Sequence, residues 1–152
     1  MGSGTGAFQI LIVEDNPCDV FLIQYALGEH KLKAECVVLT DGEQCFTYLN
    51  GLTENPGSGS PDLILLDLHV PKRDSTEIMD HLNSHDSLTH IPVIALSSSV
   101  LLQDKNDAEK RGAVHYFHKA PSLDEFVELG AIIKKVLGRT SGKPLSLSAE
   151  QP

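Results

Sequence analysis

Hydrophobic and polar positions along the chain follow two alternating patterns, which are short aliphatic runs and longer segments with helical spacing. Short apolar runs bounded by turn residues are typical of strands that are covered on both faces. The runs predict strands at 8–13, 33–39, 63–67, 91–96 and 114–118. The segments after them predict helices at 16–28, 41–50, 74–84, 100–111 and 122–137. This alternation predicts an α/β fold with a doubly wound, five-stranded parallel sheet.

Local signals mark several boundaries. Asn16 followed by Pro17 suits the N-cap and first position of a helix, and Gly28 suits a helix end. Residues 51–61 are rich in Gly, Pro and Ser and predict a flexible connector. For the whole chain we expect a flexible leader at 1–7, one domain at 8–138, and a disordered tail at 139–152, where periodicity is absent.

Polar and charged residues follow the predicted strands. Glu14 and Asp15 come directly after the first strand, and Asp67 ends the third. Ser97 and Lys119 follow the fourth and fifth strands. Ligands of doubly wound sheets bind outside the carboxyl ends of the strands, at a switch point in strand order. The sequence therefore predicts a site where these five side chains converge.

Composition narrows the classes of partner. The net charge of −9 argues against non-specific binding to nucleic acid or to anionic membranes, which need a basic surface. No apolar run approaches the roughly 20 residues that span a bilayer, and no signal peptide is recognisable. The three cysteines have no metal-ligand spacing. We expect them to be small buried residues of a cytoplasmic protein.

Four motifs at strand ends together carry a resemblance. They are Val13-Glu14-Asp15-Asn16, Leu66-Asp67-Leu68-His69-Val70-Pro71, Ala95-Leu96-Ser97-Ser98 and Tyr116-Phe117-His118-Lys119. With these motifs, the chain from Ile10 to Leu137 resembles the receiver domain of two-component response regulators, in the stand-alone form of the chemotaxis regulators. The resemblance implies a flavodoxin-like (βα)5 fold with strand order 2-1-3-4-5, and it leaves no room for a DNA-binding output domain.

The resemblance also implies a phosphoacceptor and a metal site. Asp67 would accept a phosphoryl group from a sensor histidine kinase in a Mg²⁺-dependent phosphorelay. Mg²⁺ would be bound by Glu14, Asp15, Asp67 and the backbone carbonyl of His69, with Glu14 acting through water. The imidazole of His69 would be exposed and would not coordinate the metal. The structural alternatives are a turn-capping role for Asp67 and a solvated loop acid for Glu14.

Three further residues would respond to the phosphoryl group. Ser97 would donate its hydroxyl to a phosphoryl oxygen, and Lys119 would pair first with Asp67 and then with the phosphate. Tyr116 matches the aromatic residue of the family that moves inward on activation. The alternative for Tyr116 is a half-buried strand aromatic.

Two positions depart from the family pattern. Ala120 stands where a proline usually follows the lysine, and a cis bond before a non-proline residue costs about 2.5–4 kcal/mol. Either Lys119-Ala120 bears that strain, or the loop is trans and Lys119 is placed differently. Ser75 stands where glycine is common, so we expect the turn after Asp67 to be reshaped.

The last predicted helix carries more apolar surface than one core contact requires. A core-facing stripe is formed by Leu123, Phe126, Val127, Gly130, Ile133 and Leu137. Leu129, Ile132 and Val136 widen the apolar arc. We hypothesise that these three residues contact a partner or a second copy of this chain, as a homodimer. The alternative is burial under the terminal tail.

The leading function is a single-domain response regulator whose phosphorylation switches a protein-interaction surface on helix 4, strand 5 and helix 5. It would catalyse only its own phosphorylation and slow dephosphorylation. One alternative is a pseudo-receiver that is never phosphorylated and acts as a binding or dimerisation module, which Ala120 keeps open. Another is an aspartyl-phosphate phosphatase of the haloacid-dehalogenase type. His69 opposes it, because those enzymes usually carry a second Asp at that position.

Overall fold

The computed structural model describes residues 7–55, 59–119 and 122–140, and their strands form one parallel sheet in the order β2-β1-β3-β4-β5. The strands are β1 (Phe8–Val13), β2 (Ala34–Leu39), β3 (Leu63–Asp67), β4 (Val93–Ser97) and β5 (His115–His118). The helices are α1 (Pro17–Glu29), α2 (Gly42–Glu54), α3 (Ser75–Asn83), α4 (Leu102–Lys110) and α5 (Leu123–Thr140). The predicted fold class and the strand order implied by the resemblance are confirmed.

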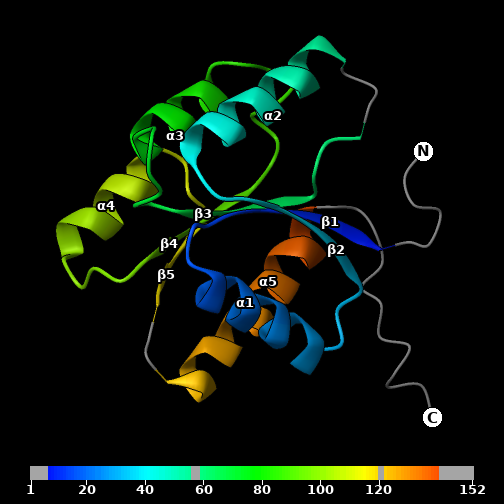
Figure 1. Ribbon diagram of the computed structural model, residues 1–152, viewed down its shortest axis with the longest axis vertical. Helices are drawn as coiled ribbons and strands as arrows, with labels where there is room; N and C mark the ends of the chain where they lie inside the picture. Colours follow the sequence, from blue (N-terminus) through cyan, green and yellow to red (C-terminus); the bar gives the residue numbers. More distant parts are fainter. Residues whose placement is uncertain (1–6, 56–58, 120–121, 141–152) are drawn as a thin grey trace.

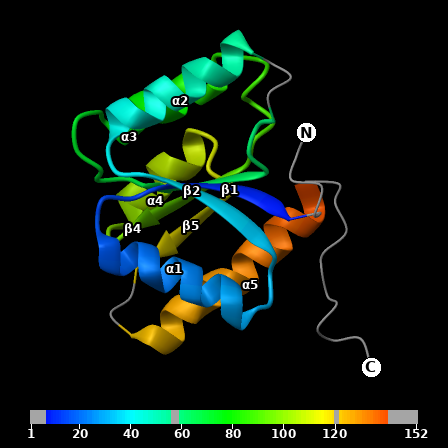
Figure 2. The same ribbon diagram turned by 45° about the vertical axis from the view of Figure 1, so that its right-hand side comes forward.

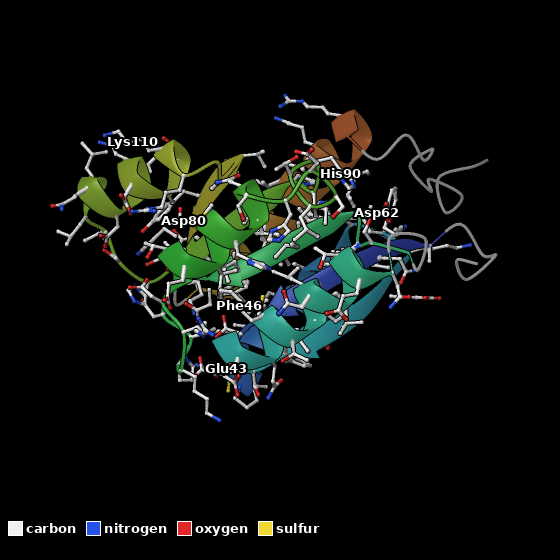
Figure 3. All side chains as sticks on the ribbon, turned by 90° about the horizontal axis from the view of Figure 1, so that it is seen from above. Glu43, Phe46, Asp62, Asp80, His90 and Lys110 are labelled. Atoms are coloured by element: carbon white, nitrogen blue, oxygen red, sulfur yellow. The ribbon has the colours of Figure 1, made fainter. Side chains whose placement is uncertain are left out.

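Helices cover both faces of the sheet, in three layers. α2, α3 and α4 lie on one face and α1 and α5 on the other (Figures 1 and 2). Figure 3 looks onto the first face and labels Phe46 of α2, Asp80 of α3 and Lys110 of α4. Alternate side chains of the central strands enter different cores, so Leu11 packs under α2 and α3 while Ile12 packs under α1 and α5. All five residues of β3 are buried, which explains its continuous apolar run.

Side-chain caps fix where several helices begin. The Asn16 side chain accepts a hydrogen bond from the Cys18 amide at 2.9 Å, and Pro17 is the first residue of α1. Asp74 and Glu77 form a reciprocal capping box at the start of α3. Both helices begin at the edge of the sheet where its parallel strands end.

Most predicted boundaries lie within two residues of those observed, but α2 is longer than predicted. It continues through Gly51 to Glu54, so the predicted connector at 51–61 is wrong over its first residues. Burial of Leu52 against the core stabilises this extra turn and outweighs the helix cost of about 1 kcal/mol for a glycine. Residues 56–58 of the connector lie outside the described part of the chain.

The hypothesis of a partner surface on α5 is wrong for two of its three residues. Leu129 is fully buried and Val136 is 8% exposed, while Ile132 is partly buried against the same core. Leu123, which was expected to face the core, is 45% exposed. The proposed homodimer through this helix therefore loses the apolar surface on which it depended.

The physical reason is that α5 packs against α1 as well as against the sheet (Figures 1 and 2). A side chain at Gly130 would collide with the His30 ring and with the Ala26 carbonyl, so glycine permits the close approach of the two helices. The ring nitrogen Nε2 of His30 lies 3.1 Å from the Val127 carbonyl oxygen, at the same crossing. The wide apolar arc of α5 is thus buried by packing against α1 and the sheet.

The end of α5 and one of the three cysteines also differ from expectation. α5 runs through Arg139 to Thr140, past the predicted start of the tail, and residues 141–152 lie outside the described chain, as do residues 1–6 of the leader. Cys45 is buried and Cys36 half-buried as small core residues, but Cys18 is exposed. Among the described helices, none is both long and apolar enough to cross a bilayer.

Candidate functional site

Three carboxylates meet at the carboxyl ends of β1 and β3. Parallel pairing aligns Val13 with Leu66, so the next residues, Glu14 and Asp67, lie side by side. Oxygen atoms of Glu14, Asp15 and Asp67 all lie within 4.8 Å of one another. Glu14 and Asp67 are buried, whereas Asp15 is exposed. Several oxygen ligands, some facing solvent, are the donor set that hard divalent cations such as Mg²⁺ prefer.

Lys119 brings a positive charge into this acidic cluster. Its backbone amide donates to the Ser97 carbonyl oxygen at 2.7 Å, which extends the pairing of β4 and β5. Its Nζ donates to Glu14 Oε1 and to Asp67 Oδ2, both at 3.1 Å, and to Asp19 Oδ2 at 2.8 Å. An ammonium group has three protons to donate. Each of them therefore has a carboxylate acceptor.

Burial and mutual contact shift the pKa values of Glu14 and Asp67 in opposite directions. Burial, followed by the hydrogen bond and negative charge of Asp67, raises the pKa of Glu14 to about 7. Burial alone would also raise the pKa of Asp67, but hydrogen bonds with Glu14 and the His69 amide, together with the Lys119 charge, lower it overall. Asp67 therefore loses its proton at lower pH than Glu14. Burial opposes the charge of Lys119, yet contact with Asp19, Asp67 and Glu14 raises its pKa.

Ser97 and His69 lie beside Asp67 on neighbouring segments. The Ser97 side chain is buried at the end of β4, and its Oγ accepts a hydrogen bond from the Ser99 amide at 3.0 Å. The His69 amide donates to Asp67 Oδ1 at 2.8 Å. His69 is exposed, as predicted, but its ring Nε2 lies 3.4 Å from Ser97 Oγ, a contact that the sequence did not indicate.

Tyr116 lies on β5, near the loop that follows β4. It is half-buried, and its hydroxyl donates to the Ser99 carbonyl oxygen at 2.9 Å. The ring nitrogen Nε2 of His118 lies 3.2 Å from the Ser98 carbonyl oxygen. Ser99 Oγ also donates to Asp104 on α4. Strand β5 and helix α4 therefore both contact the loop that follows Ser97.

The two departures from the family pattern have different outcomes. Ser75 is the buried first residue of α3, after the Asp74 cap, and the left-handed backbone conformation occurs instead at Lys72, where φ is 77°. The turn after Asp67 is thus built around Lys72. The peptide between Lys119 and Ala120 lies outside the described residues. The side chain of Lys119 nevertheless reaches Asp67.

Sequence reasoning missed one member of the site. Asp19 lies in the first turn of α1, and it makes the shortest of the three contacts of Lys119. Its signal in the sequence was weak, because an acid near a helix N-terminus is common for reasons of capping and helix dipole. The useful clue was position, since α1 starts directly after the acids of β1.

Comparison with known families agrees with this geometry. The family model for the response regulator receiver domain matches residues 10–130, which include the three acids and Lys119. The chain belongs to the response regulator receiver domain family. Receiver domains are generally modules of two-component signalling and not turnover enzymes. In this chain, the acidic cluster, Ser97 and Lys119 lie at the carboxyl edge of the sheet.

Relatives of similar sequence are regulators. The chain is 37% identical over 90 residues to the response regulator Rcp1 of Synechocystis, a match that covers 59% of this chain and 61% of Rcp1. It is 32% identical over 118 residues to a probable methanogenesis regulatory protein, FilR2, of Methanothrix harundinacea, covering 78% of this chain and 76% of FilR2. The match to Rcp1 thus spans less than two thirds of that protein.

Solved structures share the fold over almost the whole chain. The phosphorylated cyanobacterial phytochrome response regulator RcpA superposes with a TM-score of 0.77 at 33% identity, covering 91% of this chain and 99% of RcpA. The Mn²⁺-bound form of Rcp1 superposes with a TM-score of 0.75 at 28% identity, covering 91% of this chain and 98% of Rcp1. One of these relatives is thus phosphorylated and the other holds a divalent cation.

Proposed function

We propose that this chain is a phosphorylation-dependent switch that accepts a phosphoryl group on Asp67 from a sensor histidine kinase. The observation that carries the proposal is the contact of an ionised, buried Asp67 with Lys119, beside the acids Glu14 and Asp15. A buried carboxylate with a depressed pKa is available as a nucleophile. The neighbouring cation balances charge that develops on the transferred group.

The transfer needs few chemical steps from the protein. An oxygen of Asp67 attacks phosphorus, an oxygen–phosphorus bond forms, and the nitrogen–phosphorus bond of the donor phosphohistidine breaks. The electron pair of the broken bond leaves with the imidazole, which takes up a proton from water. Lys119 would contact the Asp67 carboxylate before transfer and the phosphoryl oxygens after it. Ser97 would donate a hydrogen bond from its hydroxyl to one of these oxygens.

A divalent cation would complete the charge balance. Glu14, Asp15 and Asp67 supply the carboxylate oxygens, and the His69 backbone carbonyl is the fourth proposed ligand. Mg²⁺, when bound there, neutralises negative charge on the phosphoryl oxygens. The Mn²⁺-bound structure of Rcp1 supports a divalent cation in this family. Glu14 is buried and already accepts a hydrogen bond from Lys119, and a bound cation would offset the cost of keeping its charge and that of Asp67 away from water.

Signal output would begin at Ser97. Its hydroxyl now accepts from the Ser99 amide, so turning it toward a phosphoryl group breaks that contact and frees the loop before α4. Tyr116, which donates to Ser99, would then change position, as would the surface of α4, β5 and α5. We propose that this surface meets the downstream protein, in the cytoplasm where histidine kinases donate their phosphoryl groups.

The experiment is an intact mass measurement after incubation with Mg²⁺ and a small phosphodonor such as acetyl phosphate. A gain of one phosphoryl group that requires Mg²⁺ and disappears in Asp67→Asn supports the proposal. Asp62→Asn is a matched control, since Asp62 precedes the same strand at its opposite end and should leave the mass gain intact. No gain in the wild type favours a pseudo-receiver, and a gain that survives Asp67→Asn places the phosphoryl group elsewhere.

A further inference from the structure

Asp19 contacts the site lysine but lies outside the acidic cluster that could bind a metal ion. Its Oδ2 is 2.8 Å from Lys119 Nζ, while Glu14 and Asp67 are each 3.1 Å away. Both side chains are largely shielded, with 17% of Asp19 and 13% of Lys119 exposed. Asp19 also comes from α1, whereas Glu14 and Asp67 lie at the strand ends.

The positions of these groups set up a competition between two cations. Two of the three carboxylates that accept from Lys119 are also two of the three that could bind a divalent ion. A divalent cation on Glu14 and Asp67 repels the ammonium group and takes part of its hydrogen bonding. An ammonium group that is shielded from water and has lost its acceptors is unstable, so Lys119 needs another carboxylate nearby.

We propose that Asp19 is a positioning residue that retains Lys119 at the site when a divalent cation occupies Glu14 and Asp67. The inference rests on the proposed function, since it assigns Asp19 a role in the same metal-dependent site. Asp19 keeps one full charge partner for the lysine, so that the lysine stays within reach of Asp67 without occupying the oxygens that the metal needs. The two cations then bind together, each with its own acids.

The local structure of α1 makes Asp19 suited to this role. The Asn16 cap and Pro17 fix the first turn of the helix, so the position of Asp19 relative to the strand ends is set by the backbone. The peptide after Lys119 joins it to Ala120, where the family usually has proline. A second anchor on α1 holds the lysine side chain independently of that peptide.

The test is a double-mutant cycle on Mg²⁺ affinity, measured by isothermal titration calorimetry on the full chain. Asp19→Asn should weaken Mg²⁺ binding roughly tenfold, within the range of coupling for residues in contact. In the Lys119→Met background the competing ammonium is gone. Adding Asp19→Asn there should therefore weaken Mg²⁺ binding no more than removal of an unrelated surface carboxylate does. The control for this is Asp124→Asn, which removes an exposed first-turn acid of α5.

Two further variants separate positioning from a structural role. Asp19→Glu keeps the carboxylate and should recover most of the lost affinity. Thermal unfolding in the absence of metal should show that Asp19→Asn is folded at the assay temperature. An equal loss of Mg²⁺ affinity with Lys119 and with Met at position 119 would show that Asp19 acts only as a nearby negative charge, and would overturn the proposal. Unchanged Mg²⁺ affinity in Asp19→Asn would overturn it as well.

The cycle also stands apart from the test of phosphorylation. If the wild type binds Mg²⁺ but gains no phosphoryl group, the proposed function fails while the coupling between Asp19 and Lys119 is still decided by calorimetry. If the wild type is phosphorylated, Asp19→Asn should lower the maximal rate at saturating Mg²⁺ severalfold. An unchanged maximal rate would contradict retention of Lys119 at the site.

Discussion

Truncation of Leu129 to alanine should strongly destabilise the isolated chain. The side chain is fully buried between α5, α1 and the sheet. Removing three carbon atoms loses about 2.4 kcal/mol of transfer free energy at about 0.8 kcal/mol for each. The cavity left behind adds to this loss, because α1 and the sheet relax only partly, so the free energy of unfolding should fall by about 3–4 kcal/mol.

The same substitution at Leu123 is a matched control on the same helix. Leu123 is 45% exposed, so Leu123→Ala should cost about 1 kcal/mol or less. The assay is urea denaturation followed by far-UV circular dichroism, at two protein concentrations so that self-association is visible. Equal, small effects of the two variants would show that Leu129 is not buried in the core. So would a Leu129→Ala variant with unchanged unfolding but weaker self-association, since a partner surface predicts that result.

Three other predictions concern the packing and the cysteines. Gly130→Ala should lower the free energy of unfolding by about 1–3 kcal/mol in urea denaturation, because the added Cβ meets His30. Gly28→Ala, which has open space around it, should raise the free energy of unfolding by about 0.5–1 kcal/mol. A stabilising Gly130→Ala would contradict the α1–α5 packing. Burial raises the pKa of Cys45 from 9.0 to about 12, so the unfolded state loses its proton first and stability falls as pH rises above 9. Above pH 9 the free energy of unfolding of the wild type should fall by up to about 1.4 kcal/mol more per pH unit than that of Cys45→Ala. Equal slopes of the free energy of unfolding against pH would contradict a buried thiol. Cys18, which is exposed, should react with a thiol reagent at neutral pH in the folded chain well before Cys45, as followed by mass, and comparable rates would argue against the observed burial.

The sequence predicted the sheet well because each strand carries its own signal. The aliphatic run of β3 is buried on both faces, and such a run has few alternatives to a central parallel strand. The strand order came from the resemblance, since periodicity within one strand does not say which strand pairs with it. Gly51 misled the boundary of α2, because helix propensity is local while the burial of Leu52 is tertiary.

The same limit explains the error on α5. Helical spacing identified Leu129 and Val136 as apolar positions outside the main stripe, but it could not say what lies opposite them. The approach of α1 depends on Gly130 and His30, which are far apart in sequence. For a helix packed against both a sheet and another helix, a wide apolar arc is what packing requires.

The acids of the site were predictable because strand ends of a parallel sheet meet at one edge. Glu14, Asp15 and Asp67 are indeed close together there. Asp19 was missed because its contact with Lys119 joins the start of α1 to the end of β5, across 100 residues of sequence. The contact between His69 and Ser97 depends on a side-chain rotamer, which the sequence pattern does not specify.

In the proposed switch, Asp67 itself carries the phosphoryl group. The most direct measurement is reduction of the phosphorylated chain with tritiated borohydride, which cleaves an acyl phosphate and labels its carbon, followed by proteolysis and mass spectrometry of the labelled peptide. We predict label at residue 67 and only after incubation with phosphodonor and Mg²⁺. Label at Asp15 or Glu14, or phosphoprotein without reducible label, would show that Asp67 is not the phosphoacceptor.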